Sequence, residues 1–281
     1  MRLASRDAVN AAWAAAAAPQ RSHQLVHPDG DVLLTIDHDE REGFLVETPF
    51  HGRFHVDALG GQVRCAPLAE AGTSWHGLLI GQVLPLAATL RGYEIFHAGA
   101  VVAPGGRAGL FCAGSGVGKS TLMARLVGHG AGFLADDAVA VELTGGLPLA
   151  HPGPALVHLY ERDVPLLGDD TPLRRIEGFR SMKAALAPAA VADPTPIGGL
   201  HLLERGEEGG PVRFERIDAV EPFALLSAIF TRSVKTPERL RRHLDVCAAI
   251  AERVPVFRVV VPAGTGREAM AEAVWEHLCR P

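Results

Sequence analysis

Two patterns of hydrophobic and polar positions divide the chain. Between residues 31 and 68, short apolar or alternating runs are separated by glycine, aspartate and proline, which predicts strands joined by turns. These runs lie at 32–36, 43–46, 53–56 and 62–65. Residues 76–91 instead carry leucine, valine and alanine at helical spacing despite Pro85, so we expect an apolar helix there.

The remainder mixes strand-length apolar runs with helical periodicity, which predicts an α/β fold. Strands are expected at 95–102, 109–112, 133–135, 139–143, 198–203, 212–214 and 256–261, and helices at 222–230, 237–253 and 267–278. Residues 184–196 are rich in alanine and proline and predict a loop. We therefore expect an N-terminal helix and β-rich accessory domain over 1–74 and a larger α/β domain over 75–281.

Charge and cysteine content indicate which partners and which cellular compartment to expect. The net charge of the 281 residues is −5, and acidic and basic residues are interspersed, so neither nucleic acid nor a membrane surface is an expected partner. The four cysteines are scattered without a CxxC pair, which favours reduced thiols in the cytoplasm. The alanine-rich run 11–18 resembles the apolar core of a signal peptide, but Asp7 and Asn10 precede it and a helix is the favoured interpretation.

One motif determines the expected chemistry. It reads Ala113-Gly114-Ser115-Gly116-Val117-Gly118-Lys119-Ser120-Thr121 and lies between an apolar strand-like run and a helical pattern. This is the setting of a phosphate-binding P-loop, with alanine in place of the first glycine. Glycines let backbone N–H groups converge on phosphate oxygens, and the following helix presents the positive end of its dipole. Lys119 is expected to bridge the β- and γ-phosphates of ATP, and Ser120 to hold Mg²⁺.

An acidic pair follows the helix after this motif. Asp136 and Asp137 close the run 132–135, so both carboxylates are expected where a strand ends beside the P-loop. Phosphoryl transfer needs a metal ligand and a proton acceptor, and the pair offers both. The alternative is an exposed turn or a helix cap. If the site forms, repulsion between the adjacent carboxylates is expected to raise the pKa of one of them unless Mg²⁺ neutralises the pair.

Residues 96–102, 114–120 and 134–139 together resemble the catalytic core of HPr kinase/phosphorylase and its shorter relatives. The resemblance implies a P-loop kinase fold similar to that of phosphoenolpyruvate carboxykinase. It further implies that His97 assists at the active site, that Asp137 accepts the proton in the kinase direction, and that Asp136 supports the metal or the phosphoryl group. Members of that family often assemble into oligomers, which makes a homo-oligomer an expectation here.

The chain departs from the family pattern downstream. The later motif that supplies a second metal-binding glutamate is absent, and Glu161, in Leu159-Tyr160-Glu161-Arg162, lies at nearly the right distance to replace it. The nearest basic residues that could clamp phosphate are Arg174, Arg175 and Arg180, for which a solvated loop is the alternative.

Some of the shorter relatives phosphorylate a serine of ribosomally made peptides, including lasso-peptide precursors. The resemblance thus implies a kinase, dependent on ATP and Mg²⁺, that modifies a hydroxyl of a peptide or protein, with serine as the expected acceptor. Two alternatives stay open, a nucleotide-binding regulatory protein without transfer activity and a small-molecule kinase of the same fold.

Overall fold

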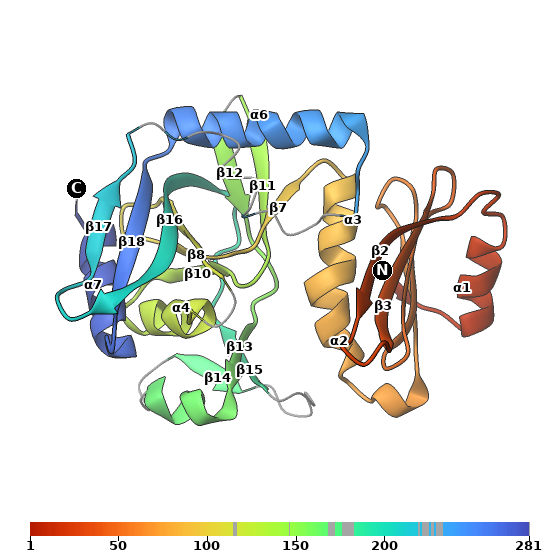
Figure 1. Ribbon diagram of the computed structural model, residues 1–281, viewed down its shortest axis with the longest axis horizontal. Coiled ribbons are helices and arrows are strands. Elements are labelled where there is room, and N and C mark those ends of the chain that lie inside the picture. The colour runs from red at the N-terminus through yellow and green to blue at the C-terminus, as the bar shows by residue number, and fades with distance from the viewer. Residues whose placement is uncertain are drawn as a thin grey trace. The chain divides into compact units, whose positions relative to one another are not determined.

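The computed structural model describes residues 1–114, 117–145, 147–167, 172–175, 183–218, 220, 225, 228 and 233–280. The chain divides into two compact units (Figure 1). Unit 1 comprises Met1–Tyr93 with Thr231–Leu240, and unit 2 comprises Glu94–Phe230 with Arg241–Pro281. Both units combine helices with sheets, so the chain is a mixed α/β protein.

Unit 1 is built on a six-stranded sheet in the order β1-β6-β5-β4-β3-β2. Its strands are β1 (Arg2–Leu3), β2 (Gln20–Val26), β3 (Val32–Asp39), β4 (Gly43–Thr48), β5 (Gly52–Val56) and β6 (Val63–Pro67). From β2 to β6 each strand pairs antiparallel with the next along the chain, as short hairpin connections favour. The four predicted strands of this region are confirmed.

A helical segment covers one face of this sheet. It follows the short 3₁₀ turn η1 (Ala69–Ala71) and runs through α2 (Trp75–Leu78), the π-helical turn η2 (Leu79–Val83) and α3 (Leu84–Leu90). Its apolar side chains pack in one buried cluster with those of β3 to β6, including Phe54. The division between the units therefore lies after Tyr93 and not after residue 74, because this helical segment shares its core with the sheet.

The opposite face of the sheet carries α1 (Arg6–Trp13), whose Val9 is buried with Leu45 and Ala66. The helix expected over 11–18 thus begins and ends earlier. Ser5 caps its start by accepting a hydrogen bond from the backbone N–H of Ala8 at 3.1 Å. Pro19 opposes helical geometry only in Ala18, so it does not by itself explain why the helix ends at Trp13.

Unit 2 contains a large mixed sheet in the order β10-β8-β9-β16-β12-β11-β7, to which β18 and β17 add beyond β16. Its strands are β7 (Glu94–Phe96), β8 (Ala98–Val102), β9 (Ala108–Cys112), β10 (Gly132–Ala135), β11 (Val139–Thr144), β12 (Leu147–His151), β16 (Thr195–Glu208), β17 (Arg213–Arg216) and β18 (Val256–Ala263). The single strand expected over 95–102 is two strands interrupted at His97, because β7 pairs with β11 whereas β8 pairs with β9 and β10.

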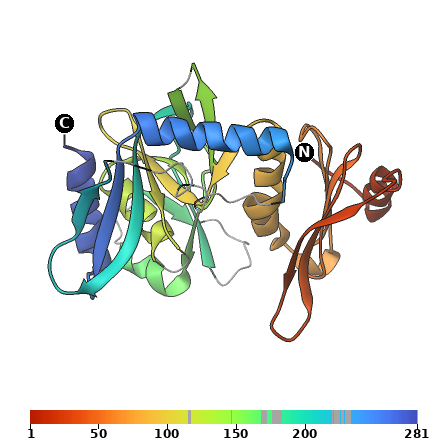
Figure 2. The same cartoon turned by 45° about the horizontal axis from the view of Figure 1, so that its top comes forward.

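Helices cover both faces of the sheet of unit 2 (Figure 2). On one face, α4 (Lys119–Gly128) and α7 (Arg267–Leu278) share a buried cluster with Phe111 and Phe133. On the other face, Val246, Cys247 and Ile250 of α6 (Pro237–Arg253) pack with alternate residues of the same strands. The predicted helices at 237–253 and 267–278 are confirmed, and the helix expected over 222–230 falls mostly outside the described residues.

A smaller sheet of unit 2 comprises β13 (Val157–Tyr160), β15 (Lys183–Pro188) and β14 (Leu173–Arg175), and η3 (Glu161–Leu167) is a 3₁₀ segment that follows β13. The loop expected over 184–196 is wrong in its first part, which forms β15. That strand is central, pairing with β13 on one side and β14 on the other, and its Ala184, Ala185 and Leu186 are buried. Among the described residues, no helix has the length and apolar character needed to cross a membrane.

Two glycines of unit 1 offer a matched test of its packing. Gly43 and Gly30 both have positive φ, at +91° and +95°. A Cβ at Gly43 would lie 2.3 Å from the carbonyl oxygen of Val56, whereas a Cβ at Gly30 would have nothing within 4 Å. We expect Gly30→Ala to cost about 1 kcal/mol from the left-handed conformation alone. Gly43→Ala should cost roughly 2–4 kcal/mol because backbone must also move. Urea unfolding followed by circular dichroism measures both, and equal losses would contradict the steric argument.

Candidate functional site

Three segments far apart in sequence meet at one edge of the larger sheet. β8 runs antiparallel to both β9 and β10, so the start of β8 lies beside the ends of the other two strands. The register pairs Ala98 with Cys112 and Ala100 with Ala135. This topology brings together His97, the loop after β9 and the acidic pair after β10.

The loop after β9 leads directly into α4. Gly118 caps this helix with φ of +105°, a conformation that a side chain would disfavour. Lys119, the first residue of α4, is only 7% exposed, and its Nζ donates a hydrogen bond to the carbonyl oxygen of Ala113 at 2.8 Å. Ser115 and Gly116, both expected to bind phosphate, lie outside the described residues.

A chain of polar contacts links Lys119 to the acidic pair through His97. Lys119 Nζ lies 3.1 Å from His97 Nε2, and His97 Nδ1 lies 3.1 Å from the carbonyl oxygen of Asp137. Because a lysine ammonium only donates, Nε2 accepts and Nδ1 carries the proton that it donates to Asp137. Burial and the charge of Lys119 lower the pKa of His97, which agrees with this neutral tautomer.

The two aspartates occupy different environments. Asp137 is exposed, and among the described residues it is the one non-glycine with positive φ, at 70°. Its Oδ1 lies 3.7 Å from His97 Nδ1. The Asp136 carboxyl accepts hydrogen bonds from the Ser120 hydroxyl and the Asp137 backbone N–H. Burial, followed by the charge of Asp137, raises the pKa of Asp136 to about 7.

A cavity of about 420 Å³ opens over these groups. It is lined by His97, Gly114, Gly118, Lys119, Ser120, Thr121 and Asp137 on one side, and by residues of β13, η3 and the start of α7 on the other. The second wall includes Tyr160, Arg162, Asp163 and Arg267, and Asp163 is 5% exposed and forms an ion pair with Arg267. Sequence reasoning missed Asp163 and Arg267 because neither lies in a motif. Asp163 is only two residues after the expected Glu161.

The side chain of Glu161 does not line the cavity, although those of its neighbours Tyr160 and Arg162 do. Glu161 is exposed and forms an ion pair with Arg175. Arg174 is exposed on β14, and Arg180 lies outside the described residues. The assignment of Glu161 as a metal ligand therefore stays a prediction.

Two neighbouring oxygens, one from Ser120 in the cavity wall and one from Asp136 behind it, could hold a hard divalent cation. Oδ1 of Asp136 is buried and has no hydrogen-bond partner among the described residues, and the Ser120 hydroxyl is adjacent. Within that same part of the chain, no group of three or more histidine, cysteine or acidic side chains gathers as a metal site. Mg²⁺ in phosphoryl-transfer sites commonly takes one or two protein oxygens, with phosphate and water completing its shell. Ser120 and Asp136 could therefore hold such a cation only together with ligands from outside the described residues.

Comparisons with known proteins give little further information. No family model matches the chain, and no curated protein matches it. The solved structure of the Hpr(Ser) kinase/phosphatase from Coxiella burnetii is similar over 65% of this chain and 87% of that chain, with 15% sequence identity and a TM-score of 0.35. A similarity this low carries no argument about activity, so the function must be argued from the residues of the site.

The raised pKa of Asp136 predicts a pH-dependent stability. The folded state holds this proton more tightly than the unfolded chain does, because the folded pKa of about 7 exceeds the ordinary value of 3.8. The free energy of unfolding that Asp136 contributes should therefore fall as the pH rises from about 4 to about 7, by on the order of a few kcal/mol at most.

Urea unfolding at pH 5 and pH 7, without nucleotide or Mg²⁺, measures this effect. In Asp136→Asn, the free energy of unfolding should no longer show this decrease with pH. In Asp245→Asn, which changes an exposed residue of α6, the decrease should persist. Identical pH slopes in the wild type and Asp136→Asn would contradict the assignment.

Proposed function

We propose that this protein is a phosphotransferase, dependent on ATP and Mg²⁺, that transfers the γ-phosphoryl group to a hydroxyl of a peptide or protein, with serine as the acceptor. One observation carries the proposal. Lys119, the His97–Asp137 pair and the Ser120–Asp136 pair come from three separate segments and line or border one cavity. Phosphoryl transfer needs a cation for the phosphates, a metal site and a proton acceptor, and these groups supply all three.

The loop and Lys119 would bind the triphosphate. The start of α4 faces the cavity through Gly118, Lys119 and Ser120, where backbone N–H groups and the helix dipole favour an anion. Lys119 would exchange its contact with the Ala113 carbonyl for phosphate oxygens. Ser120 and Asp136 would hold Mg²⁺, which neutralises charge on the β- and γ-phosphates when it is bound.

Asp137 would accept the proton of the attacking hydroxyl. Its carboxylate is exposed and lines the cavity, so an acceptor can reach it without displacing core side chains. His97 would act as a positioning residue, because its Nδ1–H holds the backbone carbonyl of Asp137 while its Nε2 accepts from Lys119. The acceptor hydroxyl and the phosphate site would then be oriented by one connected set of contacts. The serine acceptor and the peptide substrate rest on the sequence resemblance.

A second candidate is a nucleotide-binding regulatory protein without transfer activity. The position of Glu161 favours it, because this side chain pairs with Arg175 and does not line the cavity. A site with fewer metal ligands can bind a nucleotide without supporting transfer. The kinase is preferred because Asp137 lines the cavity and has a left-handed backbone, a conformation that functional sites often retain.

Two substitutions separate binding from chemistry. Lys119→Ala should abolish transfer and weaken ATP binding, because a charge-assisted contact to phosphate is lost. Asp137→Asn should keep ATP affinity within roughly threefold but lower transfer by at least about 100-fold, the usual contribution of a general base. Transfer of labelled γ-phosphate to serine-containing peptides and calorimetric titration with ATP and Mg²⁺ measure the two quantities.

Asp245→Asn provides the control and should match the wild type in both assays. Full turnover by Asp137→Asn would refute its role as proton acceptor. Tight ATP binding by the wild type with no transfer to any acceptor hydroxyl would favour the regulatory protein.

A further inference from the structure

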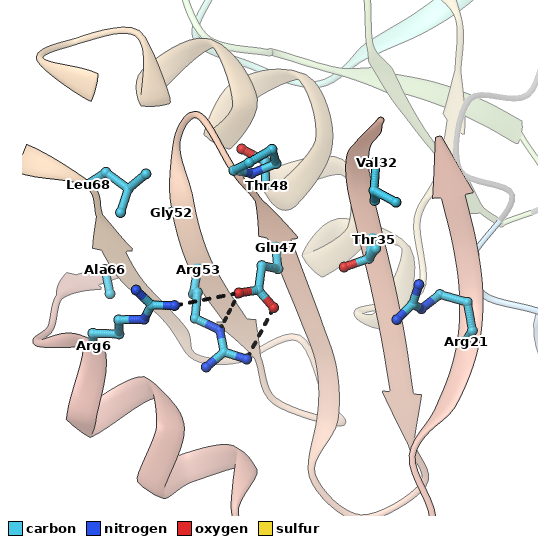
Figure 3. A pocket seen from close by; sticks show the side chains of 11 residues that line it. Arg6, Arg21, Val32, Thr35, Glu47, Thr48, Gly52, Arg53, Ala66 and Leu68 are labelled. Atoms are coloured by element: carbon cyan, nitrogen blue, oxygen red, sulfur yellow. Dashed lines mark hydrogen bonds and ion pairs between the residues drawn. The ribbon is translucent and has the colours of Figure 1, made fainter. Parts of the chain in front are cut away.

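Unit 1 contains a cavity of its own, of about 450 Å³, which the proposed kinase chemistry does not use (Figure 3). It lies on the face of the six-stranded sheet that carries α1. Arg6 comes from α1, Arg21 from β2, Glu47 from β4 and Arg53 from β5. The remaining walls are Val32, Thr35, Thr48, Pro49, Gly52, Ala66 and Leu68.

The cavity exists because α1 covers only part of this face. Val9 of α1 is buried against Leu45 and Ala66. Glu47 and Thr35 project from the same face, beyond the buried cluster of α1, and stay partly exposed. A helix of eight residues is about 12 Å long, which is too short to cover all six strands.

The charges at the two ends of the cavity differ. Arg53 binds Glu47 through two nitrogens, with Nε 3.1 Å from Oε1 and Nη2 3.2 Å from Oε2. Arg6 approaches the same carboxylate from the side on which Arg53 lies; its Nη2 is 3.9 Å from Oε1 and its side chain is 62% exposed. Two guanidinium groups thus share one carboxylate, leaving one unit of positive charge at this end. At the other end, Arg21 forms an ion pair with Asp37, so that end is neutral.

One unit of positive charge fits a single carboxylate. Arg6 makes one long contact with Glu47 and has donors to spare among its five N–H groups, which suit the planar geometry of a carboxylate. A phosphate dianion would bring more charge than this end can neutralise and would be repelled by Glu47. Ala66 and Leu68, on the side of Arg6, and Val32, on the side of Arg21, add apolar surface to the walls (Figure 3). The volume of about 450 Å³ is within the size range of small-molecule sites.

We propose that unit 1 binds a monocarboxylate with an apolar body, whose carboxylate pairs with Arg6 beside the Arg53–Glu47 pair. The ligand could be a free carboxylic acid or an acidic group of a peptide, which present the same chemistry. The proposal goes beyond phosphoryl transfer and does not depend on it, because every residue involved belongs to unit 1.

Two pairs of probes test the proposal on the full chain without nucleotide. N-acetyl-leucine and N-acetyl-leucinamide differ only in the carboxylate, and acetyl-Leu-Glu-Leu-amide differs likewise from its glutamine counterpart. Titration followed by ¹H–¹⁵N NMR gives Kd and locates the shifted resonances. We expect the carboxylate member of at least one pair to bind with shifts at the residues lining the cavity. Binding of N-acetyl-leucine identifies a free or terminal carboxylate, and binding of the glutamate peptide alone identifies an acidic side chain.

Variants then test the assigned contacts. Arg6→Gln should weaken carboxylate binding about tenfold, since a charge-assisted hydrogen bond is lost. Glu47→Gln should strengthen it, because the competing anion is removed. Arg41→Gln, at an exposed position outside the cavity, is the matched control and should change Kd less than threefold. An increase in affinity in Glu47→Gln cannot arise from unfolding.

Several outcomes would overturn the proposal. They are absence of binding by both carboxylates at millimolar concentration, equal binding of the carboxamide probes, or an equal loss in Arg6→Gln and Arg41→Gln. Repeating the titration with Lys119→Ala separates this proposal from the kinase, because carboxylate binding should be unchanged in that variant.

Discussion

The site of unit 2 depends on the burial of one charge. Lys119 is only 7% exposed, and a buried charge is costly unless polar groups surround it. The Ala113 carbonyl and His97 Nε2 are two such groups, and each belongs to a different segment of the chain. The contacts of Lys119 therefore join Ala113, just after β9, to His97 at the start of β8. The same contact makes His97 an acceptor at Nε2, which leaves its Nδ1 proton for Asp137.

This arrangement is possible because of the strand order. β8 separates β9 from β10, and its antiparallel pairing with both directs their ends to one edge of the sheet. The strand order also explains the interruption at His97, because β7, just before it, pairs with β11, whereas β8, just after it, pairs with β9 and β10. His97 lies between two strands that pair with different partners, so its ring can point toward the ends of β9 and β10. In an uninterrupted strand, successive side chains would instead point into the packed layers on the two faces of the sheet.

Local sequence predicted much of the fold and part of the site. The strands β3 to β6 of unit 1 and the helices α6 and α7 follow from the local patterns of apolar and turn residues, whereas β1 and β2 were not predicted. The glycine-rich loop and the acidic pair were found because their chemistry is encoded in contiguous residues. Asp163 and Arg267 were not, since their ion pair joins η3 to α7 across about a hundred residues, and no local pattern records such a pairing. The strand β15 was missed for a related reason: its alanines gain their strand conformation from two neighbouring strands and not from their own propensity.

The acidic pair shows how adjacent residues of the same type acquire different properties. Asp136 follows β10 directly and remains partly buried, so desolvation raises its pKa to about 7. Asp137 leaves the strand through a left-handed conformation, which directs its carboxylate outward and its carbonyl to His97. Neighbouring titratable groups with divergent environments are typical of acid–base chemistry, because each protonation state suits a different task. Here burial disfavours the charged form of Asp136, which a bound cation would offset. In the proposed reaction Asp136 would hold the metal and Asp137 would accept the proton, because the opposite arrangement would place the proton acceptor where a substrate hydroxyl has less access.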